Sequence, residues 1–269
     1  MRRSALINVM VKAADKAGRQ LLRDFGDVEH LTVSRKGPAD FVSQADRRAE
    51  AIIRDTLTEA RPEFAFFGEE SGQTGPEEPE GRWICDPLDG TTNFLHGLPH
   101  WAISIALEQA GSIVAGVIFD PVKDELFWAE RGKGAYMNDR RIRVSARRAL
   151  SDSVIATGIP HIGREEAGHR QFLGRLEAAM AQTAGVRRWG TASLDICYVA
   201  AGRYDGFWER GLSPWDVAGG IIVLKEAGGM LSDASGRAYK LDSLDIVAAN
   251  DSLHGAFLKM LKEADRKTA

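Results

Sequence analysis

Residues 83–94, Trp-Ile-Cys-Asp-Pro-Leu-Asp-Gly-Thr-Thr-Asn-Phe, decide which fold and which chemistry are expected of this chain. The apolar residues before Asp86 predict a short buried strand, and Pro87, which lacks an amide hydrogen, predicts that the strand stops there. Asp86 and Asp89 then lie beyond the strand end, where ligands bind in α/β folds. Two carboxylates this close repel each other unless a cation lies between them, and Mg²⁺ prefers oxygen ligands. The stretch therefore predicts a magnesium site in preference to an ordinary Asp-Pro turn.

Acidic residues also follow a second predicted strand, upstream of the first. The apolar segment Phe64–Phe67 continues into Gly68-Glu69-Glu70-Ser71. Alone, this pattern is typical of a solvated acidic turn, but together with the first stretch it supplies further carboxylates. Adjacent residues of an extended segment point in opposite directions. Only one of the two glutamates is therefore expected to face the predicted magnesium site.

A third stretch predicts a helix whose ends are marked in the sequence. Ser213 is typical of an N-cap, Pro214 of the first helical position and Gly228 of the residue after the helix. Asp216 lies three residues after Ser213, which is also the spacing of a capping box. A purely structural role for Asp216 therefore stays open. Two consecutive glycines inside the helix weaken it, and they indicate close packing or a nearby site.

These stretches together resemble the inositol monophosphatase family, within the lithium-sensitive, Mg²⁺-dependent sugar phosphatases. The resemblance covers nearly the whole chain and rests on Lys36–Asp40, Asp46, Gly68–Ser71, Asp86–Phe94, Gly190–Ala192, Glu209 and Trp215–Gly219. It implies an α/β (α+β) fold, a layered α-β-α-β-α sandwich with the site at the junction of two closely packed subdomains. Cys85 stands where the family usually has an aliphatic residue, and buried cysteine behaves as a small hydrophobe.

The resemblance also implies a role for each site residue. The expected ligands of two or three Mg²⁺ ions are Glu69, Asp86, the carbonyl of Leu88, Asp89 and Asp216. Glu69 and Thr91 are expected to position and activate the attacking water, and Asp46 to orient the Thr91 hydroxyl. The expected contacts with substrate are Asp89, Gly90, Thr91, Gly190, Thr191, Ala192, Glu209 and Asp216.

The order of the remaining elements predicts two subdomains that meet near residue 145. Helices are expected at 4–25 and 43–60, with a strand at 31–34 between them. Short strands at 102–107, 113–119, 125–128, 135–137 and 142–144 predict an antiparallel meander. After residue 149 strands and helices alternate. We therefore expect subdomain 1–145 to hold most metal ligands, and 146–269 to hold Asp216 and the substrate contacts. Trp189 and Trp215 are expected in the core.

Composition limits the kind of partner and the compartment. The chain has 269 residues, a net charge of −3 and only two cysteines. This charge does not favour binding to nucleic acid or to an anionic membrane, and two cysteines in apolar contexts fit a reducing compartment. Because no apolar run approaches the roughly 20 residues of a membrane span, we expect a cytoplasmic protein without membrane contact.

The expected activity is Mg²⁺-dependent hydrolysis of inositol monophosphate or a similar polyol or sugar phosphate. Cations neutralise a phosphate dianion and align the attacking and leaving oxygens. Fructose-1,6-bisphosphatase, or another small phosphomonoesterase of the same fold, is an alternative. A second alternative is a regulatory partner of the transcription and ribosome-assembly machinery, with the basic cluster of Arg140 to Arg148 as a docking patch for RNA or protein. A solvated strand and turn explains that cluster more simply. The family resemblance also implies a homodimer.

Overall fold

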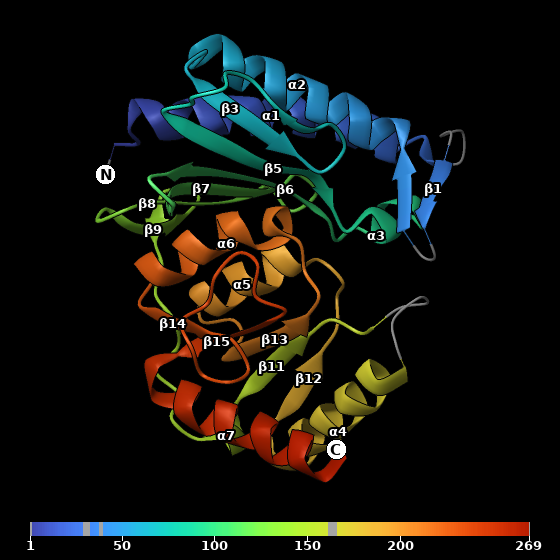
Figure 1. Cartoon of the computed structure of the whole chain (residues 1–269), viewed down its shortest axis with the longest axis vertical. Helices are drawn as coiled ribbons and strands as arrows, with labels where there is room; N and C mark the ends of the chain where they lie inside the picture. Colours follow the sequence, from blue (N-terminus) through green and yellow to red (C-terminus); the bar gives the residue numbers. More distant parts are fainter. Residues whose placement is uncertain (1, 29–32, 38–39, 161–165, 269) are drawn as a thin grey trace.

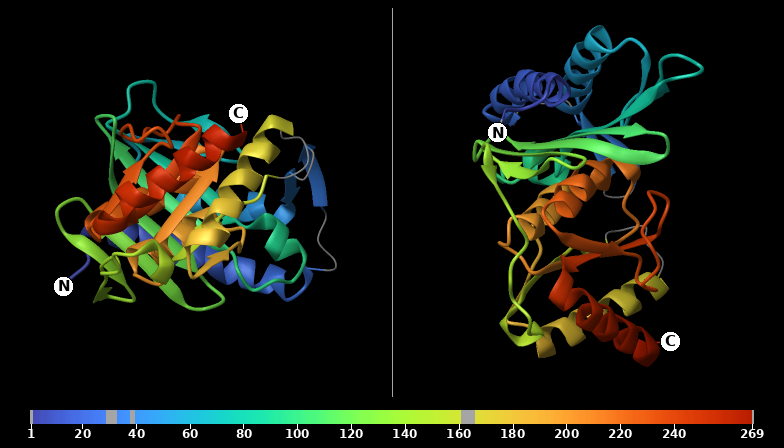
Figure 2. Two further views of the ribbon diagram at one scale, coloured as in Figure 1. Left: turned by 90° about the horizontal axis from the view of Figure 1, so that it is seen from below. Right: turned by 90° about the vertical axis from the view of Figure 1, so that its left-hand side faces the viewer.

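The computed structural model describes residues 2–28, 33–37, 40–160 and 166–268, with backbone only for 33–37, 40–42, 166 and 167. The elements form five stacked layers (Figure 1). Two helices cover an eight-stranded sheet, two more lie between this sheet and a five-stranded sheet, and the last two cover the outer face of the second sheet. Figure 2 shows the same stack from two other sides. The expected α-β-α-β-α sandwich is confirmed.

The outer helices of the first half are α1 (Ala5–Phe25) and α2 (Gln44–Ala60). Each begins at a serine N-cap: the Ser4 hydroxyl accepts the Ile7 amide, and the Ser43 hydroxyl accepts the Ala45 amide. Both helices bury an apolar face against the eight-stranded sheet. The predicted helices are therefore present, with bounds within one residue of those expected.

The eight-stranded sheet carries the first acidic stretches. Its spatial order is β10-β9-β8-β7-β6-β5-β3-β4, and β3 pairs with β5 in parallel while the strands from β5 to β10 form an antiparallel meander. The strands are β3 (Phe64–Gly68), β4 (Gly72–Thr74), β5 (Gly81–Asp89), β6 (Ala102–Gln109), β7 (Ser112–Asp120), β8 (Glu125–Glu130), β9 (Gly134–Met137) and β10 (Arg140–Arg141). The short helix α3 (Thr91–Leu95) follows β5.

The second half has a mixed sheet in the order β12-β11-β13-β15-β14. Its strands are β11 (Val154–Thr157), β12 (Gly185–Arg187), β13 (Gly206–Arg210), β14 (Gly229–Ser232) and β15 (Asp245–Asn250). Helices α5 (Ala192–Ala200) and α6 (Pro214–Glu226) lie between the two sheets, and α4 (Glu166–Gln182) and α7 (Asp251–Thr268) cover the outer face (Figure 1). The two middle helices are almost wholly buried, which explains their continuous apolar sequence.

One expected strand end is wrong, and one expected strand is absent. β5 does not stop at Pro87 but continues to Asp89, because the register with β6 shifts between Asp86 and Asp89. Such an irregularity leaves a residue unpaired, so a proline without an amide hydrogen is accommodated there. No strand forms at 142–144; the last strand of the meander is the two-residue β10.

Near the chain start, residues 33–37 and 40–43 form a small hairpin, β1 (Val33–Gly37) and β2 (Asp40–Ser43). The first half of the strand expected at 31–34 falls on residues 31 and 32, which lie outside the described residues. Among the described residues, no helix combines the length and the apolar character needed to cross a bilayer. The subdomain boundary near residue 145 stays a prediction.

Candidate active site

Two of the predicted acids lie at the end of β5. Asp86 and Asp89 are only 2% and 9% exposed. Because β3 runs parallel to β5, the turn that follows β3 lies beside them, and the Glu69 amide donates to the Cys85 carbonyl at 3.1 Å. Glu69 and Glu70 are part of this turn rather than of an extended strand. The expectation that they alternate like strand residues is therefore wrong.

The acids of the two stretches and of α6 act on one another. Burial raises the pKa of Asp86 and of Asp216 well above the usual range, and the charges of neighbouring carboxylates raise it further. Burial also raises the pKa of Asp89 to about 6, although a hydrogen bond from Ser193 opposes the rise. Glu69 contributes to the raised pKa of all three aspartates. The predicted metal-binding acids therefore lie near enough to one another for their charges to interact, and they are called the acidic centre below.

These acids are not held in the geometry of a finished metal site. In the ranges that the structure describes, no three His, Cys, Asp or Glu side chains come together so as to hold a metal ion. Like-charged carboxylates repel each other and cost free energy when buried together. The donors at the centre are carboxylate oxygens. Leu88, whose amide donates to Asp86 Oδ1 at 2.9 Å, offers a carbonyl oxygen as well, and this all-oxygen set suits a hard divalent cation. The residues present therefore fit Mg²⁺ by their chemistry.

The N-terminal end of α5 binds one of the carboxylates. The Ser193 amide donates to Asp89 Oδ2 at 2.7 Å. Because the first amides of a helix have no partner within the helix, a carboxylate satisfies them and also interacts favourably with the helix dipole. Thr191 and Ala192, predicted as substrate contacts, precede Ser193 on the same turn, and both are buried. The sequence analysis missed Ser193, because no sequence motif marks it.

The backbone between the two halves approaches closely at Gly90. This residue has φ of +94°, and a Cβ there would lie 2.7 Å from the Thr191 hydroxyl. The positive φ and the close Thr191 hydroxyl each require glycine at position 90. The fold therefore brings Gly90 next to the Gly190–Ala192 turn, although about a hundred residues separate them in the sequence.

The Thr91 hydroxyl is held at the start of α3. Its Oγ1 lies 3.1 Å from Asp46 Oδ1 and 3.0 Å from the Leu88 carbonyl, so the single hydroxyl proton has two acceptors. Asp46 Oδ2 accepts both the amide and the hydroxyl of Ser43, at 2.9 and 2.6 Å. Asp46 therefore caps α2 with one oxygen and contacts Thr91 with the other. Burial raises its pKa, and these hydrogen bonds oppose the rise.

Glu50 supports the turn that carries Glu69, and the sequence analysis missed it. Glu50 is 2% exposed, and its Oε2 accepts the Glu70 amide at 2.7 Å. A Cβ at Gly68 would clash with the Glu50 carboxylate, so glycine is needed before the two glutamates. On α2, Glu50 resembles any helix surface acid in sequence; only the packing of α2 on β3 gives it this role.

Asp216 caps α6, and its charge also interacts with the other acids of the site. Its Oδ2 accepts the Ser213 amide at 2.7 Å, which is the capping contact. The same carboxyl has its pKa raised chiefly by burial and then by Asp89. A carboxylate has two oxygens, so one can cap α6 while the group still belongs to the acidic centre.

Glu209 lies at the other end of the site, on β13, and is half-buried. Its charge contributes to the raised pKa of Asp216 and of Asp195. Glu209 is therefore near enough to the acidic centre to act on it, while it belongs to the second sheet.

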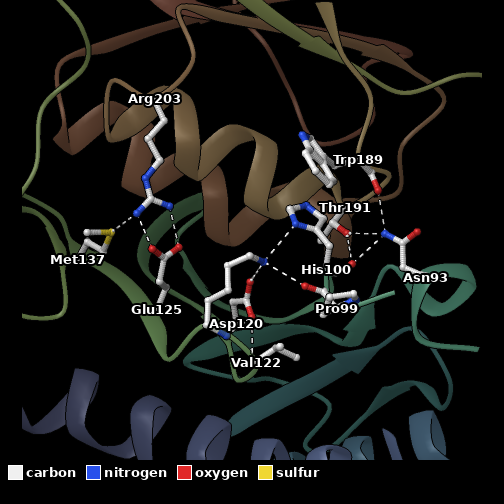
Figure 3. A network of polar contacts seen from close by, with 11 residues as sticks. Asn93, Pro99, His100, Asp120, Val122, Glu125, Met137, Trp189, Thr191 and Arg203 are labelled. Atoms are coloured by element: carbon white, nitrogen blue, oxygen red, sulfur yellow. Dashed lines mark hydrogen bonds and ion pairs between the residues drawn. The ribbon is translucent and has the colours of Figure 1, made fainter. Parts of the chain in front are cut away.

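A network of polar contacts joins the two halves beside the site (Figure 3). Asn93 Nδ2 donates to the carbonyls of His100 at 2.8 Å and Trp189 at 2.7 Å, and Thr191 Oγ1 donates to the same His100 carbonyl at 3.1 Å. The buried His100 ring lies over Trp189, with 5.2 Å between ring centroids. Trp189 is nevertheless 51% exposed, so the expectation of a core residue is wrong for it.

Further along the same network, Lys123 connects the β7–β8 turn to His100. Lys123 Nζ lies 2.5 Å from the buried Asp120 Oδ2 and 3.2 Å from His100 Nδ1 (Figure 3). An ammonium group only donates hydrogen bonds, so His100 Nδ1 accepts and the ring is neutral. Burial first, and then the charge of Lys123, lower the His100 pKa to about 4. His100 is therefore a structural residue of this junction rather than a proton donor at neutral pH.

Trp215, in the first turn of α6, is half-buried. Its ring meets Phe67 edge-on, with centroids 5.3 Å apart, and the Ser104 hydroxyl donates to its carbonyl at 3.1 Å. The start of α6 is in this way attached to both β3 and β6. The packing holds Asp216, one residue further on, against the end of the first sheet.

Comparison with known proteins agrees with this architecture. The model of the inositol monophosphatase family matches residues 2–266. The inositol-1-monophosphatase of Rhizobium meliloti (strain 1021) is 56% identical over 262 residues, which are 97% of this chain and 98% of that protein. The Nus factor SuhB of Escherichia coli (strain K12) is 40% identical over 259 residues, 96% of each chain.

A solved structure is also similar over almost its whole length. The extragenic suppressor protein suhB of Bartonella henselae superposes with a TM-score of 0.93 at 56% identity, covering 97% of this chain and 99% of that one. Sequence and fold thus point to the same group of proteins. The chain belongs to the inositol monophosphatase family and is an enzyme, a phosphoric monoester hydrolase.

Proposed function

We propose that this enzyme is a Mg²⁺-dependent phosphatase that hydrolyses inositol monophosphate, or a similar polyol or sugar phosphate, with water. The observation that carries the proposal is the shared acidic centre, in which Glu69, Asp89 and Asp216 all raise the pKa of the buried Asp86. Such a centre is stabilised by a divalent cation and is costly without one. Relatives named inositol-1-monophosphatase support the substrate class.

The metal ligands in this proposal are Glu69, Asp86, the Leu88 carbonyl, Asp89 and Asp216. A bound divalent cation supplies neutralisation of phosphate charge and lowers the pKa of water. The protein positions the groups around it: the Ser193 amide binds Asp89, and the Ser213 amide binds Asp216. These fixed contacts leave the carboxylates little freedom to turn away.

The attacking water is oriented by Thr91 and Glu69 in this proposal. Because Asp46 accepts from the Thr91 hydroxyl, the hydroxyl oxygen is left to accept a hydrogen bond from water. Glu69, beside the acidic centre, can then take a proton from that water. The role of Asp46 is to hold Thr91 in this orientation.

The remaining predicted residues contact the substrate. The glycine backbone of Gly90 allows the phosphate to approach closely, together with Gly190, Thr191 and Ala192 on the turn before α5. Glu209, on β13, accepts hydrogen bonds from hydroxyl groups of the polyol. In this proposal both halves of the chain contact the phosphate, and Glu209 of the second half binds the polyol.

Metal removal and a substrate panel test the proposal. In excess EDTA we expect hydrolysis to stop, and in Mg²⁺ we expect millimolar Li⁺ to inhibit, because Li⁺ occupies an oxygen site with half the charge. The panel contains inositol-1-phosphate, fructose-1,6-bisphosphate, histidinol phosphate and 3′-phosphoadenosine 5′-phosphate. Inositol-1-phosphate should give the highest kcat/KM. Full hydrolysis in EDTA would contradict the metal mechanism; a preference for the bisphosphate would move the assignment to the alternative activity.

A homodimer is the oligomeric state that we propose, as the family resemblance implies. The apolar strands of the meander are mostly buried, so they do not supply a dimer surface. Leu98 and Trp189, which are 52% and 51% exposed, offer apolar area instead. Light scattering at micromolar concentration should give a mass near twice 29.4 kDa. A mass near 29.4 kDa would show a monomer.

A second function, as a regulatory partner of the transcription machinery in the cytoplasm, is favoured by the relatives named Nus factor SuhB. The arginines of the basic cluster are all exposed. A pull-down from cell extract should recover components of that machinery with the wild-type chain. A variant with Arg140, Arg141 and Arg143 changed to Ser should recover less. Equal recovery by both would remove the basic cluster from this function.

A further inference from the structure

Gly158, which is not one of the predicted site residues, lies beside Glu209. Gly158 directly follows β11, which pairs in parallel with β13, and the register places Thr157 opposite Trp208. The next residues along the two strands are therefore Gly158 and Glu209. Both lie at the carboxyl ends of parallel strands, the edge at which α/β sheets bind ligands.

The backbone of Gly158 does not itself require glycine. Its φ is outside the left-handed region that side chains avoid. What excludes a side chain is Glu209, because a Cβ at position 158 would overlap both carboxylate oxygens of Glu209. The Glu209 carboxylate thus occupies the volume that any other residue at 158 would need.

A second acid, Asp195 on α5, lies near enough to Glu209 for the two charges to interact. Asp195 is 1% exposed, and neither of its carboxylate oxygens has a hydrogen-bond partner among the described residues. Burial raises its pKa well above the usual range, and the charge of Glu209 is the largest of the charges that raise it further. Buried carboxyl groups normally have hydrogen-bond partners, so this part of the molecule has acceptor capacity that the protein does not use.

We propose that Gly158 is a positioning residue that sets specificity for polyol substrates, because the lack of a side chain lets the Glu209 carboxylate lie against the end of β11. In that position the half-buried Glu209 carboxylate accepts hydrogen bonds from substrate hydroxyl groups. The inference rests on the proposed phosphatase function and deepens it. Since the end of a glutamate side chain is flexible, an added methyl group displaces the carboxylate and leaves the strand in place.

The test compares Gly158→Ala with a matched variant, Gly255→Ala, whose Cβ would meet nothing within 4 Å. For each, kcat and KM are measured with inositol-1-phosphate and with p-nitrophenyl phosphate, which has no hydroxyl groups to bind. We expect KM for inositol-1-phosphate to rise about ten-fold in Gly158→Ala, the scale of one altered substrate contact. Its kcat, its kinetics with p-nitrophenyl phosphate and its Tm should stay near wild type. The kinetic parameters of Gly255→Ala should also match wild type, while its Tm should rise slightly because alanine favours a helix interior.

A double variant separates an effect through Glu209 from a general one. If Gly158 acts through Glu209, Gly158→Ala should add nothing to the KM of Glu209→Ala. The inference is overturned by an unchanged KM in Gly158→Ala, by equal losses with both substrates, by a large fall in Tm, or by additive effects in the double variant. A wild-type enzyme that does not hydrolyse inositol-1-phosphate overturns the proposed function as well. Normal wild-type hydrolysis with any of the other outcomes overturns only the role of Gly158.

Discussion

Glu69→Gln should lower kcat by roughly a thousand-fold or more, which is about 4 kcal/mol of transition-state stabilisation. Glutamine keeps the size of the side chain but removes the charge that acts on Asp86, Asp89 and Asp216. In the proposed mechanism it loses both a metal ligand and the group that takes the proton from water. The measurement is kcat at saturating Mg²⁺ and saturating inositol-1-phosphate.

Glu70→Gln is the matched control, since it is the same change one residue further along the same turn. The Glu70 contact that the structure shows at this turn is made by its backbone amide, with Glu50 Oε2 at 2.7 Å, and the substitution leaves that amide in place. Its charge is not among the leading causes of the raised pKa of Asp86. We expect less than about a ten-fold loss of kcat, the size of a change outside the reacting groups. The reverse order of the two effects would show that Glu70, and not Glu69, belongs to the acidic centre.

Asp216→Asn should abolish most turnover while the protein stays folded. Asparagine caps helices about as well as aspartate, and its amide oxygen can still accept from the Ser213 amide, which now binds Asp216 Oδ2 at 2.7 Å. What is lost is the charge shared with Asp89 and Glu69. We expect kcat to fall by roughly a thousand-fold, about 4 kcal/mol, and Tm measured in the absence of Mg²⁺ to change little.

The control for this variant is Asp251→Asn, because Asp251 is an exposed acid in the first turn of α7. This variant makes the same chemical change in the first turn of another helix, far from the candidate active site. Its kcat and Tm should both equal those of the wild type. If Asp216→Asn also keeps wild-type kcat, its role is limited to capping α6.

The sequence by itself was enough to propose which residues carry the chemistry. Asp86, Asp89 and Asp216 lie within short motifs, and their neighbours Pro87, Gly90 and Pro214 mark turns or helix starts through local backbone preferences. The helix caps at Ser4 and Ser43 and the strand order of the meander were predictable for the same reason. Each of these features depends on residues a few positions apart in the chain, where sequence patterns are informative.

Only the tertiary structure decided which of these residues come into contact and which other residues hold them in place. β5 continues past Pro87 because its pairing with β6 allows an irregularity there. Glu50 binds the Glu70 amide only because α2 packs beside β3, and Gly158 adjoins Glu209 only because β11 pairs with β13. Trp189 is exposed although its aromatic character predicted burial. Contacts between segments distant in sequence follow from strand register and layer packing, and a single sequence contains no local signal for either.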